Sequence, residues 1–139
     1  MAVITPTSHE SQTHIRRWVA HEEVAVVALC AAWCDTCTEF RRTLDRLAQA
    51  RPDIVFVWLD IEDDSAICGD IDVENFPTLA IYRGKQLLHY GVSLPQEASV
   101  GRLIDAVAQR TENAASGAQA VLDLPQKLWP AGRVPGSVA

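Results

Sequence analysis

The chain has 139 residues, of which 48% are hydrophobic and 22% are charged, and its formal net charge is -6 at pH 7. This length and composition predict one globular domain that is large enough to bury a core without stabilising disulfides or metal ions. The acidic balance, with no basic cluster along the chain, argues against binding to nucleic acid.

The N-terminal residues and the apolar runs bear on location. The chain begins without a basic stretch followed by a long apolar core, so we do not expect a secretory signal. No apolar run approaches the roughly 20 residues of a membrane span, and no membrane contact is expected. The sequence therefore predicts a cytoplasmic protein. In a reducing cytoplasm, a catalytic or redox-sensing cysteine pair is expected in preference to a structural disulfide.

The first half of the chain alternates helical and strand patterns. Residues 8–20 have apolar side chains on one helical face. Val24–Cys30 is a continuous apolar run, which predicts a strand buried on both faces. Residues 34–50 repeat apolar side chains at helical spacing, and residues 54–61 predict a second buried strand.

The second half predicts a hairpin followed by a helix. The expected elements are a short helix or loop at 63–70, a strand at 79–82, a tight turn at 83–85, a strand at 86–90 ended by Gly91, and a helix at 95–108. Strand–helix–strand units followed by a hairpin predict an α/β fold. We expect a central mixed sheet of four to five strands with helices on both faces.

The C-terminal residues differ in composition from the rest of the chain. We predict a domain over residues 1–112 and a flexible extension over residues 113–139, where Ala, Gly, Ser and Pro dominate. The extension holds a short apolar patch, which is expected to dock on the domain or on a partner. The patch consists of Val121, Leu122, Leu124, Leu128 and Trp129.

A pair of cysteines separated by two residues, Cys34 and Cys37, lies where the first strand meets the second helix. A helix N-terminus carries partial positive charge and N–H groups without helical partners, which favour the thiolate form of the first cysteine. The thiolate is the reactive form in disulfide exchange. Zinc needs about four ligands, and the sequence has no second pair of this spacing, so redox chemistry is preferred over a metal site.

Four features in chain order resemble the thioredoxin family. They are Trp33-Cys34-x-x-Cys37 after a buried strand, Asp60 and Glu62 at the end of the next strand, Phe76-Pro77-Thr78 before the hairpin, and Gly91 after it. The resemblance covers residues 8–110 and implies the thioredoxin fold. It also implies a thiol–disulfide oxidoreductase that acts on protein disulfides and receives electrons from a reductase or a small thiol, with no metal or organic cofactor.

The resemblance assigns roles to the site residues. Cys34 is implied to be the attacking thiolate, and Cys37 the thiol that resolves the mixed disulfide. For the substrate-binding residues, Pro77 is implied to be a cis-proline beside the cysteines, with the backbone of Phe76 pairing with a substrate strand. The final two implied roles are that Trp33 shields the sulfurs and Gly91 permits close approach of a substrate.

Three positions in and near the motif depart from the family. Asp35-Thr36 stands where reductases of the family usually carry Gly-Pro. Asp35 opposes thiolate formation by its charge and also favours the helix N-terminus, so the net effect on the site is left open. Arg42 aligns with the proline that usually kinks this helix, which predicts a straighter helix.

The family's buried acid–base helper is also missing. Its acid aligns with Ala28, and its lysine companion aligns with Trp58. Cys37 is therefore expected to lose its proton to water, to Glu62 or to a partner. Such a helper contributes about 10²–10⁴-fold where it acts, so we predict a functional but slow general reductase.

The remaining cysteines leave several alternatives open. Cys30 and Cys68 are expected to be buried thiols, with a regulatory disulfide between them as an alternative. The spacing C-x3-C-x2-C formed by Cys30, Cys34 and Cys37 also occurs at iron–sulfur clusters. The extended strand is expected to carry the Cys30 sulfur away from the helix start, which argues against a cluster.

A second function is also consistent with the sequence. The missing helper and the altered pair between the cysteines fit a non-catalytic adaptor or chaperone that binds one client protein. In that case the groove at Phe76-Pro77 and the C-terminal extension would hold the client.

Overall fold

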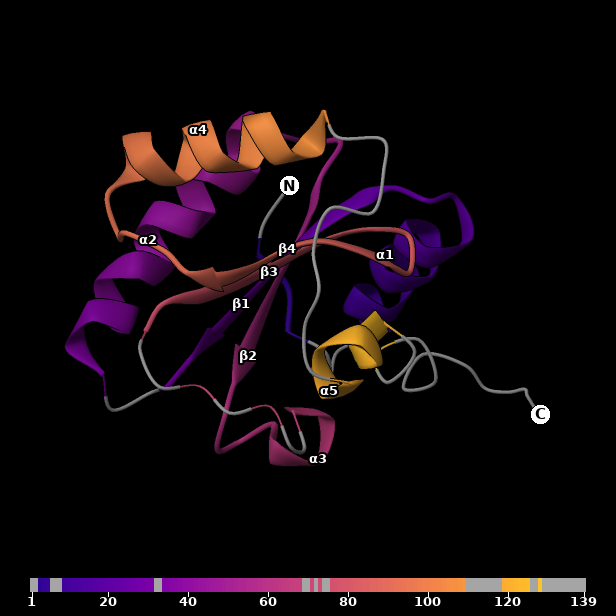
Figure 1. Ribbon diagram of the computed structural model, residues 1–139, viewed down its shortest axis with the longest axis horizontal. Coiled ribbons are helices and arrows are strands. Elements are labelled where there is room, and N and C mark those ends of the chain that lie inside the picture. The colour runs from indigo at the N-terminus through magenta and orange to yellow at the C-terminus, as the bar shows by residue number, and fades with distance from the viewer. Residues whose placement is uncertain are drawn as a thin grey trace.

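The structure, a computed structural model, describes residues 3–5, 9–31, 34–68, 71, 73, 76–109, 119–125 and 128. In this part of the chain, five helices surround one four-stranded sheet (Figure 1). The elements are α1 (His9–Ala20), β1 (Val24–Cys30), α2 (Asp35–Ala50), β2 (Val55–Asp60), α3 (Ser65–Cys68), β3 (Thr78–Arg83), β4 (Gln86–Val92), α4 (Glu97–Ala108) and α5 (Gln119–Leu122). The predicted α/β fold with a mixed sheet is confirmed.

The sheet has the strand order β2-β1-β3-β4. The β1 strand is parallel to β2 and antiparallel to β3, and the hairpin of β3 and β4 completes the sheet. The predicted turn of this hairpin contains Gly84, whose φ of 57° lies in the left-handed region that favours glycine. The parallel and antiparallel parts therefore fall where the element order predicts them.

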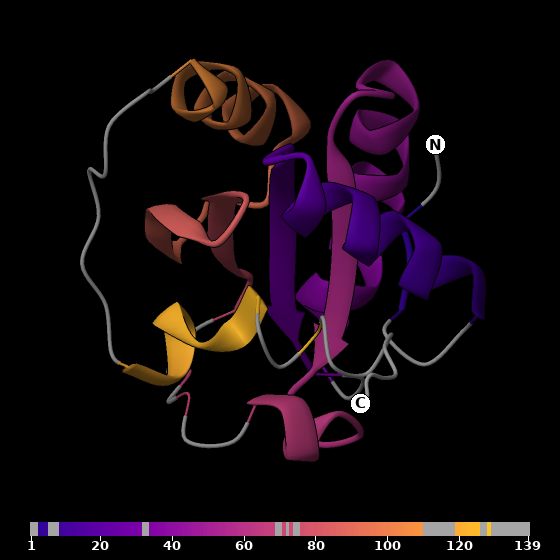
Figure 2. The same ribbon diagram turned by 90° about the vertical axis from the view of Figure 1, so that its right-hand side faces the viewer.

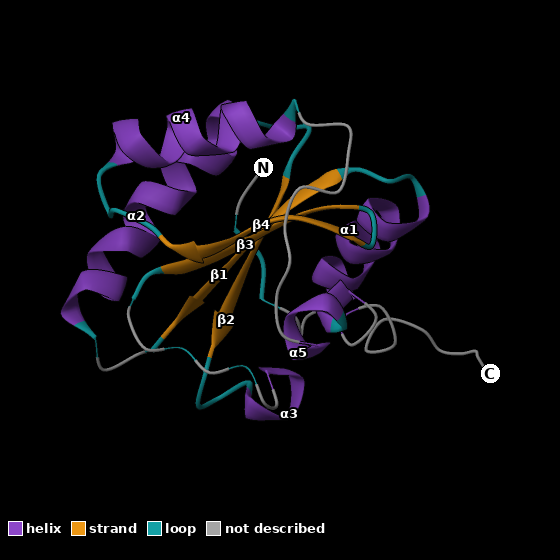
Figure 3. Cartoon of the chain, in the orientation of Figure 1, coloured by secondary structure: helices purple, strands orange, loops and turns teal. Residues whose placement is uncertain are grey.

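Helices cover both faces of the sheet (Figure 3). The helices α2 and α4 pack on one face, whereas α1 and α5 lie on the other, in front of the strands in Figure 2. All seven residues of β1 are buried because helices cover the strand from both sides. This double coverage explains why the first strand is a continuous apolar run rather than an alternating one.

The core divides into two clusters that the sheet separates. The first cluster lies beneath α2 and α4 and includes Ala28, Cys30, Cys37, Phe40, Phe56 and Leu79. The second cluster lies beneath α1 and α5 and includes Trp18, Val27, Cys68, Ala80, Tyr82 and Val121. Alternate residues along β1 and β3 enter opposite clusters, as the two-residue period of a strand requires.

An N-terminal residue extends the sheet beside β2. The Ile4 N–H donates to the Phe56 carbonyl at 2.9 Å, and the Trp58 N–H donates to the Ile4 carbonyl at 2.8 Å. This isolated parallel bridge pairs Ile4 with Val57. The sequence did not predict it, because one paired residue has no periodicity to detect.

The described part of the extension docks on the domain. Val121, Leu124 and Leu128 are buried in the second core cluster. The Tyr82 hydroxyl donates to the Val121 carbonyl at 2.7 Å, and burial raises the pKa of this tyrosine. Leu122 is 38% exposed. The fifth member of the predicted patch, the tryptophan after Leu128, lies outside the described residues, as does most of the extension.

One predicted element boundary is wrong. Gly91 does not end its strand, because β4 continues to Val92 through the pairs Leu79–Gly91 and Thr78–Val92. The other strand predictions agree with the structure to within a residue or two. Within the described residues, no helix is both long and apolar enough to cross a membrane.

Candidate active site

The candidate site lies where three chain segments meet at one edge of the molecule. These segments are the end of β1, the start of α2 and the start of β3 (Figure 1). The Cys34 N–H donates to the Ala31 carbonyl at 3.1 Å, so the chain turns sharply between the strand and the helix. This turn brings the first residues of α2 back over the end of β1.

Cys34 occupies the N-cap position of α2. Its backbone is extended, with φ of -90° and ψ of 120°, and its side chain is half-buried. The Thr38 N–H donates to the Cys34 carbonyl at 3.1 Å, which closes the first helical turn. Asp35, in this turn, is exposed. Cys34 thus lies at the helix end whose first N–H groups lack helical partners, and its side chain makes no capping hydrogen bond.

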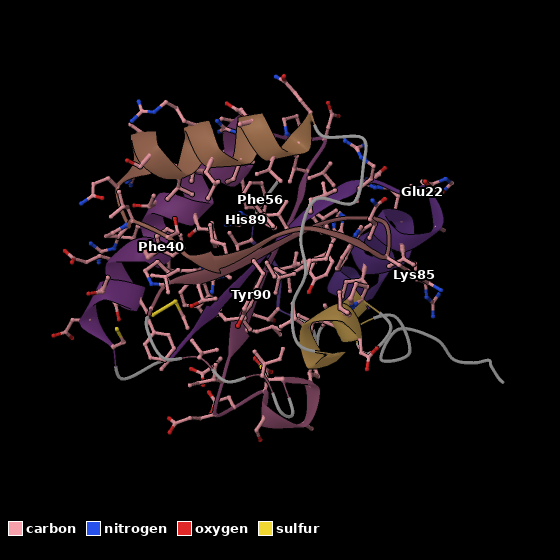
Figure 4. All side chains as sticks on the ribbon, in the orientation of Figure 1. Glu22, Phe40, Phe56, Lys85, His89 and Tyr90 are labelled. Carbon is pink, nitrogen blue, oxygen red and sulfur yellow. A yellow bond between two sulfur atoms is a disulfide. The ribbon has the colours of Figure 1, made fainter. Side chains whose placement is uncertain are left out.

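Cys37 lies one helical turn further along α2 and is 1% exposed. Residues three apart share a helix face, so Cys34 and Cys37 lie on the same side of α2. The Cys37 sulfur forms a disulfide with Cys30, and the two Cα atoms are 5.8 Å apart (Figure 4). This Cα separation is usual for a disulfide.

This disulfide corrects the prediction for Cys30. The extended strand was expected to carry the Cys30 sulfur away from the start of the helix, and that expectation is wrong. The sharp turn at Ala31 folds α2 back over the strand end, so Cys30 points into the cluster that α2 covers. Cys68 is a buried thiol in the second cluster, on the opposite face of the sheet, so the alternative Cys30–Cys68 disulfide is also wrong.

Ala28, which the family resemblance aligns with a buried acid, lies in the same core cluster as Cys30 and Cys37. Ala28 is fully buried in the first cluster, two residues before Cys30 on the same face of β1, and it pairs with Trp58 on β2. Its methyl group has no atom that accepts a proton. The guanidinium of Arg41, a residue of α2, lies over the Trp58 ring, 5.2 Å from its centroid.

Pro77 lies beside the end of β1. The Phe76–Pro77 peptide bond is cis, the isomer that the resemblance implies. The register pairs Leu29 with Thr78, so Pro77 follows next along the strand toward Cys30. The Pro77 carbonyl accepts the Ser93 N–H at 2.9 Å, and Phe76 packs against the first core cluster, as Cys34 does.

The surface beyond Pro77 is partly apolar. Val92 is 58% exposed and Leu94 is 64% exposed. A Cβ atom added at Gly91 would have Nε2 of His89 as its nearest described neighbour, at 3.9 Å, so an added methyl group fits the chain itself. Close packing within the domain therefore does not explain the glycine. Trp33, the other predicted site residue, lies outside the described residues.

The acids at the end of β2 form a turn. The Asp60 carboxylate accepts the N–H groups of Glu62 at 2.8 Å and Asp63 at 3.0 Å. The Asp64 carboxylate accepts the Asp60 N–H at 2.8 Å, and burial raises the pKa of Asp64. Asp60 thus organises the turn, while Glu62 is exposed. Across the described residues, no three His, Cys, Asp or Glu side chains are grouped to hold a metal ion.

The core beneath α2 and α4 contains two buried aromatic side chains. Figure 4 places Phe40, Phe56 and His89 on the side of the sheet that α2 and α4 cover. Phe40 is 1% exposed and Phe56 is fully buried, so both are core residues. Both aromatic residues belong to the same buried cluster as the Cys30–Cys37 disulfide.

Comparison with known proteins identifies the family. The thioredoxin family model matches residues 3–106, so the chain belongs to the thioredoxin family. The thioredoxin of Ophiophagus hannah is 27% identical over 70 residues, which are 50% of this chain and 67% of that protein. Mitochondrial thioredoxin-3 of Saccharomyces cerevisiae is 29% identical over 76 residues, which are 55% of this chain and 60% of that protein.

Solved structures show the same fold. Oxidised mitochondrial thioredoxin 3 of Saccharomyces cerevisiae superposes with a TM-score of 0.59 at 23% identity, covering 75% of this chain and 94% of that one. Thioredoxin NaTrxh of Nicotiana alata gives a TM-score of 0.63 at 20% identity, covering 76% of this chain and 91% of that one. The thioredoxin fold of this chain is therefore confirmed.

Proposed function

We propose that this chain is a thiol–disulfide oxidoreductase that acts on protein disulfides through Cys34 and Cys37. The observation that carries the proposal is the placement of the two cysteines. Cys34 is a half-exposed thiol at the N-cap of α2, and Cys37 is buried one turn further along the same helix face. Membership of the thioredoxin family supports the same chemistry.

The reaction proceeds by two exchanges. In the reduced chain, the Cys34 thiolate attacks one sulfur of a substrate disulfide, and the other substrate sulfur leaves as a thiolate. Cys37 then loses its proton and attacks the Cys34 sulfur, which releases the second substrate thiol and leaves a Cys34–Cys37 disulfide. A reductase or a small thiol returns two electrons to complete the cycle.

The second exchange is the slow one in this proposal. Cys37 is 1% exposed, and Ala28 in the same core cluster accepts no proton. A positioned general base contributes about 10²–10⁴-fold to a proton transfer, and the resolving step here proceeds without one. We therefore propose a working reductase whose mixed disulfide persists longer than that of a reductase with a buried acid.

Substrates are proposed to bind beside Pro77. The exposed Val92 and Leu94 offer apolar surface next to this proline, which supports the location. Phe76 and Gly91 would contact the substrate backbone, as the family resemblance implies, and Trp33 would cover the sulfurs. The cytoplasmic location remains a prediction, since matched relatives include mitochondrial and chloroplastic proteins. The domain boundary at residue 112 also remains a prediction.

Insulin reduction with dithiothreitol as electron donor tests the proposal. The wild-type chain is expected to accelerate precipitation of the insulin chains, whereas the variant Cys34→Ser is expected to match dithiothreitol alone. Cys68→Ser is the matched control, because Cys68 is buried on the opposite face of the sheet. Equal rates for wild type and Cys34→Ser would refute the proposal and favour the adaptor function. An adaptor would keep its biological activity when both Cys34 and Cys37 are replaced by serine.

A further inference from the structure

Three cysteines meet at the junction of β1 and α2. Cys30 is the last residue of β1, Cys34 caps α2, and Cys37 lies in the first turn of that helix. Cys37 and Cys30 form the disulfide, while the Cys34 thiol is half-buried and reaches solvent. The oxidised chain thus retains a thiol that solvent reaches.

Cys37 is the sulfur that both neighbours share. Its sulfur is bonded to that of Cys30 within the first core cluster, and the two Cα atoms are 5.8 Å apart. It also shares a helix face with Cys34, three residues earlier. The sharp turn between Cys30 and Cys34, in which the Cys34 N–H donates to the Ala31 carbonyl, brings both residues to the start of the helix that carries Cys37.

We propose that Cys30 is a third redox-active cysteine, which exchanges with Cys34 for the shared partner Cys37. The Cys34 thiolate attacks the Cys37 sulfur, a Cys34–Cys37 bond forms, and the Cys30–Cys37 bond breaks. Cys30 leaves as a thiolate and takes a proton, in place of the proton that Cys34 gave up. The step needs no external oxidant or reductant, because one disulfide and one thiol are present on each side.

The exchange gives the oxidised chain two forms with different chemistry. In the Cys34–Cys37 form, no sulfur of the pair can attack a substrate. In the Cys30–Cys37 form, Cys34 remains a nucleophile and its resolving partner is occupied. This second form rests on the proposed function of Cys34, and it deepens that function by adding a monothiol activity.

The monothiol form is expected to hold a low-molecular-weight thiol. Cys34 attacks the disulfide of such a thiol, one half bonds to Cys34, and the other half leaves as a thiolate. With Cys37 bonded to Cys30, the adduct on Cys34 persists. Replacing Cys30 frees Cys37 to attack the adduct, which releases the small thiol and forms the Cys34–Cys37 disulfide.

Thiol counting on oxidised variants tests whether the Cys30–Cys37 pair forms. The Cys34→Ser chain has three thiols when reduced, and after treatment with equimolar diamide we expect one, the Cys68 thiol. Three remaining thiols per unfolded chain would overturn the inference. A monomer on a non-reducing gel is required in the same sample, and Cys34→Ala serves as a second variant if the serine chain does not fold.

Peptide mapping of the wild-type chain tests whether the pair forms in competition with Cys34. Oxidised chain is trapped in acid with N-ethylmaleimide and cleaved before Asp35, which separates Cys34 from Cys37. We expect label on Cys34 and a link between Cys30 and Cys37 in a fraction of the chains. Label on Cys30 with none on Cys34 would overturn the inference, and Cys68, a thiol in both forms, is expected to be labelled in either case.

The adduct test uses glutathione disulfide as the probe. Wild-type chain in the Cys30–Cys37 form is expected to keep one glutathione per chain, and Cys30→Ala is expected to keep none. Equal retention by both chains overturns the inference. Insulin reduction separates the two proposals: if Cys34→Ser loses that activity but keeps three thiols after oxidation, the proposed function stands and the third redox cysteine falls.

Discussion

The variant Ala28→Asp places a carboxyl group at the position that the family resemblance aligns with a buried acid. Ala28 is fully buried in the first core cluster, which also contains Cys37. The new carboxyl group is expected to face the cluster that contains Cys37 and to accept its proton there. We expect the resolving step to accelerate by up to about 10²–10⁴-fold, the usual contribution of a positioned base.

The same substitution is expected to destabilise the fold. A buried carboxyl group without a full set of partners costs about 1–3 kcal/mol when neutral. Each unit by which burial raises its pKa adds about 1.4 kcal/mol to the cost of ionising it. We therefore expect the free energy of unfolding at pH 7 to fall by about 2–4 kcal/mol. Because the folded pKa lies above the unfolded one, this loss is smaller near pH 4 than at pH 7.

Reaction of the reduced chain with Ellman's reagent separates the two exchanges. The first release of thionitrobenzoate reports attack by Cys34, and the second reports resolution by Cys37. Ala80→Asp is the matched control, since Ala80 is equally buried but lies in the second cluster, on the other face of the sheet. An unchanged second phase in Ala28→Asp, or equal acceleration in both variants, would refute the reasoning.

Three further predictions concern stability, measured by urea unfolding. Tyr82→Phe leaves the Val121 carbonyl without its donor, and we expect a loss of about 1–2 kcal/mol together with faster proteolysis of the extension; unchanged proteolysis would contradict this. Burial raises the pKa of Asp64, so its contribution to stability is lost as pH rises, and Asp64→Asn should be at least as stable as wild type at pH 7, with the gain absent near pH 3. Lower stability at pH 7 would contradict that sign. The Arg51 hydrogen bond lowers the pKa of Asp105, so Asp105→Asn should cost about 0.5 kcal/mol at pH 7 and nothing once the pH falls below the folded pKa of Asp105. A loss that persists in acid would show that the effect is not ionic.

The sequence predicted β1, β2 and β3 well because these strands are buried almost throughout. Val24–Cys30 is a continuous apolar run, and the structure assigns β1 the same bounds. The family motifs likewise placed Cys34 at the helix start and Cys37 one turn inside. Both predictions depend on residues that are close together in the sequence, so the sequence shows them directly.

The contacts that sequence reasoning missed depend on turns. The disulfide of Cys30 and Cys37 requires α2 to fold back over the strand end, and the hydrogen bond from Cys34 to Ala31 that produces this has no sequence period. The spacing of the three cysteines is the available signal, but spacing alone does not show that the sulfurs of Cys30 and Cys37 face each other. The bridge at Ile4 was missed for a similar reason, because its pairing is set by the finished sheet.

Trapping the mixed disulfide tests the central claim most directly. In the variant Cys30→Ser/Cys37→Ser, solvent reaches the half-buried Cys34 thiol, whereas Cys68 is buried. A peptide disulfide should therefore leave one peptide per chain, bound to Cys34 and released by dithiothreitol. Adding Cys34→Ser should abolish the adduct. An adduct that persists in this triple variant, or none in the double variant, would contradict the proposal that Cys34 carries out disulfide exchange.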